Sequence, residues 1–269
     1  MIRLPDRALP GDAQQKLDGY QREIDAIAGY AARVERAKSS WKSRNRKGNP
    51  TFDAVKDSLT AMCSGARRCV YCEDSAADEV EHFRPKDLYP EVVFAWSNYL
   101  YACGPCNGPK NNRFAVFARG SGTLTEVARA RGAPVVAPVP GDPVLLDPRK
   151  EDPCAYLALD LRDTFWFVPR AGRGTVEHQR AEYTIDVLRL NENEFLPKAR
   201  QQAYKDYKAH LSQYRLRLEQ GAPRSHLRRL HKDLRDRQHP TVWSEMKRQH
   251  AGIPELATLF KAIPEALGW

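Results

Sequence analysis

The chain of 269 residues carries a formal net charge of +9, with 42% hydrophobic and 29% charged residues. This length allows a substantial core, as one extended domain or two small ones. No apolar stretch approaches the ~20 residues of a membrane-spanning helix, and the first residues lack the apolar core of a secretory signal. We therefore expect a cytoplasmic protein, in which paired cysteines bind metal more often than they form disulfides.

The positive charge is concentrated in two segments. Residues 198–237 contain twelve lysines and arginines against four acids, and residues 33–47 contain seven against one. Two basic segments around a mildly acidic centre suit a polyanionic partner such as nucleic acid. The alternative is that both are solvated helix faces, and charge alone does not decide between the two.

The first 62 residues are predicted to be helical. Residues 12–47 form one amphipathic pattern that Asp12 is suited to cap, and Thr51 is expected to cap a shorter helix after the break at Gly48-Asn49-Pro50. The apolar stripes of both helices predict core or a docking surface rather than chemistry.

The remainder of the chain changes character several times. Residues 118–143, rich in Gly, Pro and Ala, are expected to be loop, and two strands are predicted at Tyr156–Asp160 and Thr164–Val168. From Val176 the chain is predicted to be helical, with breaks near Asn191, Gly221, His239 and Gly252. The sequence thus predicts a helix-dominated α+β fold. Its four regions are residues 1–62 (helical), 63–117 (cysteine-rich), 118–175 (loop and hairpin) and 176–269 (basic and helical).

Four of the six cysteines form two C-x₂-C pairs, Cys69 with Cys72 and Cys103 with Cys106. Two such pairs complete the tetrahedral four-thiolate shell that zinc prefers. Thirty residues separate the pairs, more than a simple zinc ribbon needs, so another structure must fold between them. The alternative is two unrelated pairs of buried thiols. Cys63 and Cys154 have no such partners and are expected to be ordinary apolar residues.

The segment between the pairs contains Glu81-His82, then Asn98, and Asn107 follows the last cysteine. In this order, enclosed by two C-x₂-C pairs, these residues resemble the HNH family of nucleases, also called ββα-metal or His-Me finger nucleases, in its zinc-stapled form. The resemblance covers roughly residues 69–112 and implies that residues 63–117 are a small ββα core. The elements that it implies are a strand ending with Val80–His82, a loop at 96–98, a strand at 99–102 and a helix at 106–112.

The chemistry of phosphodiester hydrolysis explains these residue types. The reaction needs a water molecule activated near neutral pH, where histidine titrates. It also needs a cation on the phosphate and the leaving oxygen, where negative charge accumulates. A hard divalent ion held by a carboxylate and an amide oxygen meets that need.

The resemblance implies a role for each residue. His82 is the general base, and Glu81 and Asn107 bind a catalytic magnesium or manganese ion. The side-chain amide of Asn98 forms hydrogen bonds with the backbone and so holds His82 in place. The four paired cysteines bind a structural zinc ion, and Arg84 and Lys110 are candidate phosphate contacts. Two positions depart from the family pattern: Glu81 stands where Asp is commoner, and Asn107 where His is commoner. The second departure favours magnesium or manganese over zinc in the catalytic site.

A longer resemblance narrows the family. The phrases Glu81-His-Phe-Arg-Pro-Lys86 and Trp96-Ser-Asn-Tyr-Leu100 are similar to the HNH subunits of Septu-type anti-phage systems (PtuB). Weaker similarities at 145–149 and 184–191 extend it over most of residues 50–200. That family implies an ABC/SMC-like ATPase partner (PtuA-like) which assembles with the nuclease and controls it.

The predicted function is therefore that of an HNH endonuclease, the effector of a defence system, acting on DNA in preference to RNA. One alternative is a stand-alone restriction-type HNH nuclease, which would have no ATPase gene beside its own. The other is a non-catalytic zinc-stapled module that binds nucleic acid. The intact set of Glu81, His82, Asn98 and Asn107 argues against the second alternative.

Overall fold

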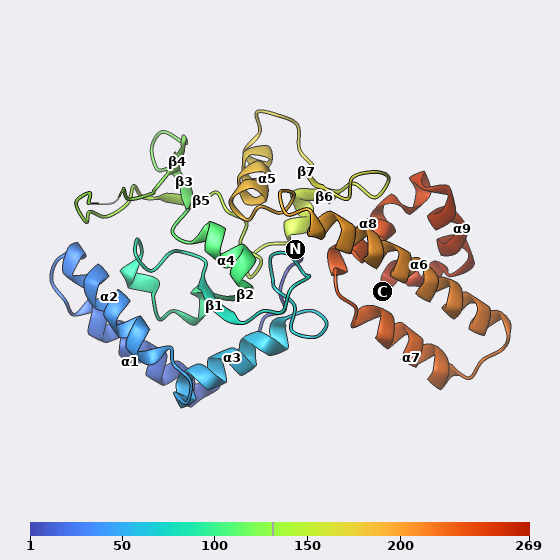
Figure 1. Ribbon diagram of the computed structural model, residues 1–269, viewed down its shortest axis with the longest axis horizontal. Helices are drawn as coiled ribbons and strands as arrows, with labels where there is room; N and C mark the ends of the chain where they lie inside the picture. Colours follow the sequence, from blue (N-terminus) through green and yellow to red (C-terminus); the bar gives the residue numbers. More distant parts are fainter. Residues whose placement is uncertain (131) are drawn as a thin grey trace.

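The computed structural model describes residues 1–130 and 132–269 and shows a helix-dominated α+β fold, as the sequence predicts (Figure 1). The helices are α1 (Gly11–Asp25), α2 (Tyr30–Arg44), α3 (Pro50–Met62), α4 (Gly104–Lys110), α5 (Val176–Val187), α6 (Phe195–Glu219), α7 (Arg224–Arg235), α8 (Pro240–Gln249) and α9 (Pro254–Ala262). The strands are β1 (Glu79–His82), β2 (Tyr99–Ala102), β3 (Ala115–Ala118), β4 (Leu124–Glu126), β5 (Gly141–Pro143), β6 (Leu157–Leu159) and β7 (Phe167–Pro169).

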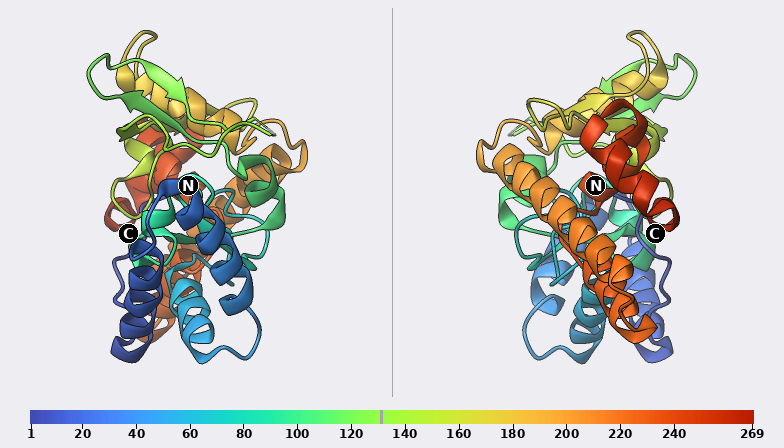
Figure 2. Two further views of the ribbon diagram at one scale, coloured as in Figure 1. Left: turned by 90° about the vertical axis from the view of Figure 1, so that its left-hand side faces the viewer. Right: turned by 90° about the vertical axis from the view of Figure 1, so that its right-hand side faces the viewer.

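Short 3₁₀ helices lie at Pro90–Val92, Trp96–Asn98, Pro153–Ala155, His250–Gly252 and Pro264–Gly268. Along the long axis of the molecule, α1–α3 lie at one end and α6–α9 at the other, with β1, β2 and α4 between them (Figure 1). The side views show the same separation, with α1–α3 facing the viewer in one and α6 in the other (Figure 2). None of the helices within residues 1–130 and 132–269 has the length and apolar character needed to cross a membrane.

The N-terminal helices differ from the prediction in two respects. The single helix expected over residues 12–47 is two helices, because Gly29 adopts a φ of +84° immediately before α2 and interrupts the helical backbone. Asp12 lies in the first turn of α1 rather than at its cap. The cap of α3 is Asn49, whose side chain accepts a hydrogen bond from the backbone N–H of Thr51, so the predicted cap at Thr51 is also wrong.

The central strands form an antiparallel hairpin that leads into α4. Glu81 pairs with Leu100 and His82 with Tyr99, so the predicted acid–His pair ends β1. Strand β2 occupies the predicted residues 99–102, and α4 begins two residues before the predicted helix start at Cys106. The order strand, strand, helix therefore surrounds the second cysteine pair.

The stretch of residues 118–143 predicted as loop contributes two edge strands, β4 and β5, to a small sheet whose central strand, β3, directly precedes it. The glycine and proline content of the stretch made these edge strands hard to predict. One of the glycines, Gly141, is required by the close approach of the paired strand. A Cβ atom at Gly141 would overlap the carbonyl oxygen of Phe117 on the paired strand. The two later strands, β6 and β7, pair as predicted, although β7 begins at Phe167 because the side chain of Asp160 binds the backbone N–H groups of Arg162 and Thr164 in the turn.

Two apolar clusters hold these elements together. One runs from the four paired cysteines through β3, β6 and β7 to α5, α6, α8 and α9. The other joins α1–α3 to residues 93–101 and includes Trp41, Phe52 and Tyr99. The centre thus packs against helices on both sides.

Candidate functional site

Four cysteine side chains converge beside the central hairpin. Cys69 and Cys72 precede β1, Cys103 is the N-cap of α4, and Cys106 lies in its first turn. All four are buried, and their sulfur atoms lie within 4.8 Å of one another, with 3.8 Å between Cys72 Sγ and Cys103 Sγ. A tetrahedral zinc ion with Zn–S bonds of about 2.3 Å requires sulfur atoms about 3.8 Å apart. The geometry therefore fits one structural metal ion, which zinc suits best.

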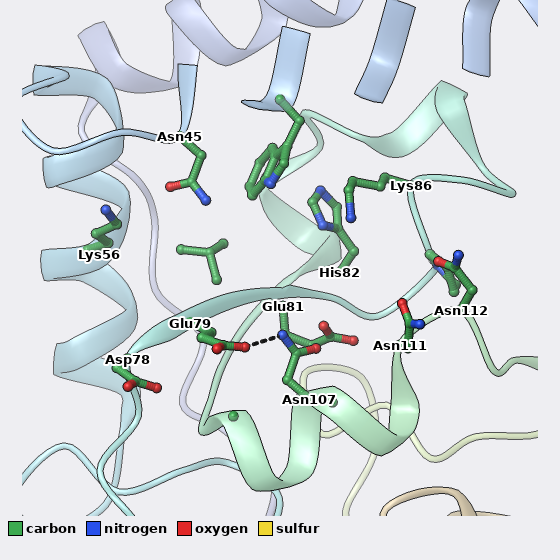
Figure 3. A pocket seen from close by; sticks show the side chains of 15 residues that line it. Asn45, Lys56, Asp78, Glu79, Glu81, His82, Lys86, Asn107, Asn111 and Asn112 are labelled. Carbon is green, nitrogen blue, oxygen red and sulfur yellow. Dashed lines mark hydrogen bonds between the residues drawn. The ribbon is translucent and has the colours of Figure 1, made fainter. Parts of the chain in front are cut away.

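A pocket of about 540 Å³ opens on the other side of β1 (Figure 3). Its floor is formed by β1 and α4, and residues from the C-terminal end of α2 and from the middle of α3 form one flank. Glu81, His82 and Asn107, which the sequence analysis assigned to catalysis, all line this pocket. The expected base and both expected metal ligands thus line one cavity.

His82 lies deep in the pocket wall, with 5% of its surface exposed. Its ring packs edge-on against Trp41, with 4.2 Å between ring centroids, and against Tyr99, at 5.3 Å. Its Nε2 lies 3.0 Å from the carbonyl oxygen of Val93. Because a carbonyl only accepts, the proton of the neutral ring is on Nε2 and the lone pair is on Nδ1. Burial, followed by the positive charge of Lys86, lowers the pKa of His82 to about 3, so the ring is neutral at physiological pH.

Asn98 lies behind the pocket rather than in it. Its side-chain oxygen accepts a hydrogen bond from the backbone N–H of Arg84, and its amide nitrogen donates to the carbonyl oxygens of Arg84 and Val92. The same side chain therefore ties the segment after His82 to the segment that carries Val93, the partner of the His82 ring. Its contribution to holding the base remains a prediction.

Glu81, in the pocket floor, forms a buried ion pair with Lys110, which does not itself line the pocket. Lys110 is 0% exposed, and its amine also donates a hydrogen bond of 2.9 Å to the backbone carbonyl of His82. Burial raises the pKa of Glu81, and the charge of Lys110 opposes that rise. Lys110, a candidate phosphate contact in the sequence analysis, is thus directed at Glu81 rather than at the open pocket.

Arg84, the other candidate phosphate contact, also lies outside the residues that line the pocket. Its guanidinium group stands over the rings of Tyr89 and Phe114, at 5.0 Å and 5.6 Å from the ring centroids. A cation stacked on aromatic rings is stabilised where it is. The structure therefore brings together the acid, the base and the amide, but not these two cations.

Asn107 is held by a residue that the sequence analysis missed. Its amide Nδ2 donates a hydrogen bond of 2.5 Å to Oε2 of Glu79, which turns the amide oxygen toward Glu81 (Figure 3). Carboxylate and amide oxygens are the donors that hard divalent cations prefer, so Glu81 and Asn107 fit such an ion. Glu79 stands two residues before Glu81 on the same strand, and the two-residue period of strands is the signal that points to it.

The two basic segments differ in how their charges are used. In α2, Arg36 and Arg44 both pair with Glu23, and Lys38 lies 3.6 Å from Asp87. In the second segment Arg200 is 1% exposed and donates to two backbone carbonyls, so it is not available to a ligand. Along α7 several arginines are exposed, and no carboxylate among the described residues lies within 4.0 Å of them. These residues are Arg224, Arg228, Arg229 and Arg235.

Comparison with known proteins supports part of the resemblance. No protein-family model matches the chain. A part of the chain is similar to the Septu protein PtuB of Bacillus thuringiensis, with 40% identity over 70 residues, which is 24% of this chain and 27% of that relative. The similar stretch thus spans about a quarter of the relative's length. The chain thus shares one similar segment with a Septu protein, and its four clustered cysteines could bind a metal ion such as zinc.

Proposed function

We propose that the chain is a metal-dependent HNH endonuclease that hydrolyses phosphodiester bonds in nucleic acid. One observation carries this proposal: Glu81, His82 and Asn107 line a single pocket beside a buried four-cysteine cluster. A structural zinc site is closed by its four protein ligands, whereas a catalytic ion needs positions open to water and substrate. A buried cysteine cluster beside an open pocket lined by oxygen atoms meets both needs.

In the proposed reaction His82 is the general base. Its Nε2–H is engaged by Val93, and Nδ1 has no hydrogen-bond partner among the described residues. As a water oxygen attacks phosphorus, Nδ1 accepts the water proton and the bond from phosphorus to the leaving oxygen breaks. A divalent ion held by oxygens of Glu81 and Asn107 would supply positive charge for the phosphate and the leaving oxygen.

Two further residues position this machinery. Glu79 orients the Asn107 amide so that its oxygen is directed at the cation rather than away from it. Lys110 holds the Glu81 carboxylate in place and, by donating to the His82 carbonyl, fixes the end of β1. Buried hydrogen-bonded supports of this type orient catalytic groups without contacting the substrate.

The similarity to a Septu protein supports the biological setting that we propose: anti-phage defence, together with an ABC/SMC-like ATPase partner. DNA is the proposed substrate ahead of RNA, and an assay on both nucleic acids decides between them. Helices outside the central hairpin then supply the surface on which the ATPase docks.

The test is a cleavage assay with the purified chain, alone and with the ATPase, on supercoiled plasmid and on tRNA in magnesium or manganese. We expect plasmid cleavage that requires both metal and His82. Cleavage at full rate without the ATPase would favour a stand-alone nuclease. No cleavage of either substrate by the complete assembly, with nucleic acid still bound, would favour a non-catalytic zinc module.

A further inference from the structure

Two lysines stand on opposite sides of the catalytic residues. Lys56 extends from α3 on one flank of the pocket, and Lys86 lies beyond His82 on the other (Figure 3). Both side chains are half-buried, and both line the pocket. Within residues 1–130 and 132–269, no carboxylate oxygen lies within 4.0 Å of either amine. Cations placed in a pocket without an internal partner are available to an external anion.

Nearby cations are already engaged, which sets these two apart. Lys110 is paired with Glu81, and Arg84 is stacked on aromatic rings. Lys38 and Arg44, from the helix that forms the same flank, are paired with Asp87 and Glu23. The phosphate contacts expected from Arg84 and Lys110 must therefore come from other residues.

Lys86 lies next to His82 in the pocket (Figure 3). A phosphate bound at Lys86 thus lies next to the proposed point of attack. Lys56 lies beyond Glu79 on the opposite side of the pocket, the side that Asp78 also lines (Figure 3).

The balance of charge in the pocket adds a condition. Asp78 and Glu79 offset Lys56 and Lys86, and Glu81 is already paired with Lys110, so the lined pocket has no net positive charge. A phosphodiester strand therefore gains net attraction only when a divalent cation is also present.

On this basis, and resting on the proposed function, we propose that one phosphodiester strand crosses the pocket from Lys56 to Lys86. The scissile phosphate lies over Glu81 and His82, and the phosphates on either side of it contact the two lysines. Lys56 belongs to an N-terminal helix, so substrate binding involves a residue outside the central hairpin. Binding of the strand requires a divalent cation.

The test is binding rather than cleavage, so that its result is independent of turnover. Fluorescence anisotropy of a labelled single-stranded oligonucleotide and of its duplex is measured in calcium, over a range of salt concentrations. We expect Lys56→Ala and Lys86→Ala each to weaken binding by about fivefold. For the single strand, each substitution should also reduce the slope of the logarithm of the binding constant against the logarithm of the salt concentration by about 0.7. Without calcium, and with no chelator that would remove the structural zinc, wild-type binding should weaken and the effect of both lysine substitutions should disappear.

Lys261→Ala, at an exposed lysine of α9, is the matched control and should leave affinity and slope unchanged. Thermal midpoints of all variants should agree, because none of these lysines has an ion-pair partner among residues 1–130 and 132–269. Wild-type affinity and slope in both Lys56→Ala and Lys86→Ala would overturn the proposed path, as would a wild-type protein that binds neither oligonucleotide in calcium. Lysine-dependent binding without cleavage in magnesium or manganese would instead overturn the nuclease function and leave the path standing.

Discussion

Two buried histidines, one in the centre and one in the C-terminal helices, differ in a single respect. His82 and His210 are 5% and 8% exposed, and the Nε2 atom of each lies 2.9–3.0 Å from a backbone carbonyl. The second ring nitrogen of His210 is 3.2 Å from a guanidinium nitrogen of Arg237, whereas that of His82 has no partner among the described residues and its ring lines the pocket. A fully satisfied histidine stabilises the fold, and one with a free lone pair at a pocket can accept a proton.

The same contrast extends to the two regions as a whole. In the C-terminal helices the buried guanidinium of Arg200 is satisfied by the carbonyl oxygens of Phe165 and Leu190. In the centre, the buried carboxylate of Glu81 is held by one cation and borders an open pocket. Burial of a polar group therefore does not by itself identify a functional site. A buried polar group indicates a functional site when one of its atoms can still donate or accept a hydrogen bond or bind a metal ion.

The largest effect should come from removing a cysteine of the cluster. Structural zinc contributes on the order of 10–16 kcal/mol in zinc-finger peptides, and the centre has few other elements to replace it. Cys106→Ser should lose zinc, measured by elemental analysis, and lose hydrogen-exchange protection in β1 and β2, while α6–α9 stay folded. Cys63→Ser and Cys154→Ser are the controls, since neither residue belongs to the cluster, and each should retain one zinc ion per chain. Wild-type protein that contains no metal would contradict the prediction.

The next effect separates the two histidines. His82→Ala should reduce the cleavage rate by about 10²–10⁴-fold. It also removes a buried ring, but the Val93 carbonyl still accepts from the Tyr99 hydroxyl, so the thermal midpoint should fall less than in His210→Ala. His210→Ala should leave the cleavage rate near that of the wild type and lower the thermal midpoint more, because it leaves the Leu230 carbonyl and the Arg237 guanidinium unsatisfied at a cost of about 1–3 kcal/mol. Cleavage rate and thermal unfolding of both variants give the result. A well-folded His82→Ala protein that cuts at the wild-type rate would falsify the HNH assignment.

A smaller effect is expected at Glu79, which contacts Asn107 but has no proton to move. Supports of metal ligands typically contribute about 10–100-fold to metal affinity. Glu79→Ala should raise the manganese concentration needed for cleavage and recover activity when manganese is in excess. Asn107→Ala, which removes the proposed ligand itself, should respond in the same direction and recover less. His82→Ala should not recover at any metal concentration, and a Glu79→Ala variant with an unchanged metal requirement would remove Glu79 from the site.

The smallest effect concerns α7, at the opposite end of the molecule from α1–α3. Charge reversal of Arg228, Arg229 and Lys232 together should weaken binding to all nucleic-acid sequences alike and flatten its salt dependence, because these side chains neutralise phosphates without reading bases. Lys232 already pairs with Asp236, so Arg228 and Arg229 should account for most of the change. If the triple variant binds and cuts normally, the α7 surface is solvated or faces the ATPase.

Local signals predicted much of the fold. The bounds of β2 and the breaks between the C-terminal helices agree with the structure, because strand alternation, helical periodicity, Gly and Pro act over a few residues. The split between α1 and α2 was missed because the apolar pattern continues across Gly29. The β3–β5 sheet was missed because its strands are only three or four residues long and β4 and β5 lie in a stretch rich in Gly, Pro and Ala.

Within the site, the sequence indicated which residue types meet but not what else they contact. Glu81, His82 and Asn107 share a pocket, as their order suggested, while Lys56 enters it from a helix 25 residues upstream of Glu81. Lys110 and Lys86 have the same side chain, and only packing decides that one is buried under Glu81 and the other is open to the pocket. Arg200, counted among the basic residues, is structural for the same reason.

The contact between Trp41 and the His82 ring limits how this centre can be transplanted. A fragment of residues 63–117 would carry the four clustered cysteines and every residue of the proposed HNH motif, yet would leave one face of the His82 ring open to water. The Tyr30 hydroxyl donates to the Leu88 carbonyl and the Phe94 N–H donates to the Gln21 side chain, so the loop that carries Val93 would also lose its anchors. A minimal portable unit therefore begins before Gln21. Engineering or ancestral reconstruction of this centre should treat the N-terminal helices as part of the catalytic unit.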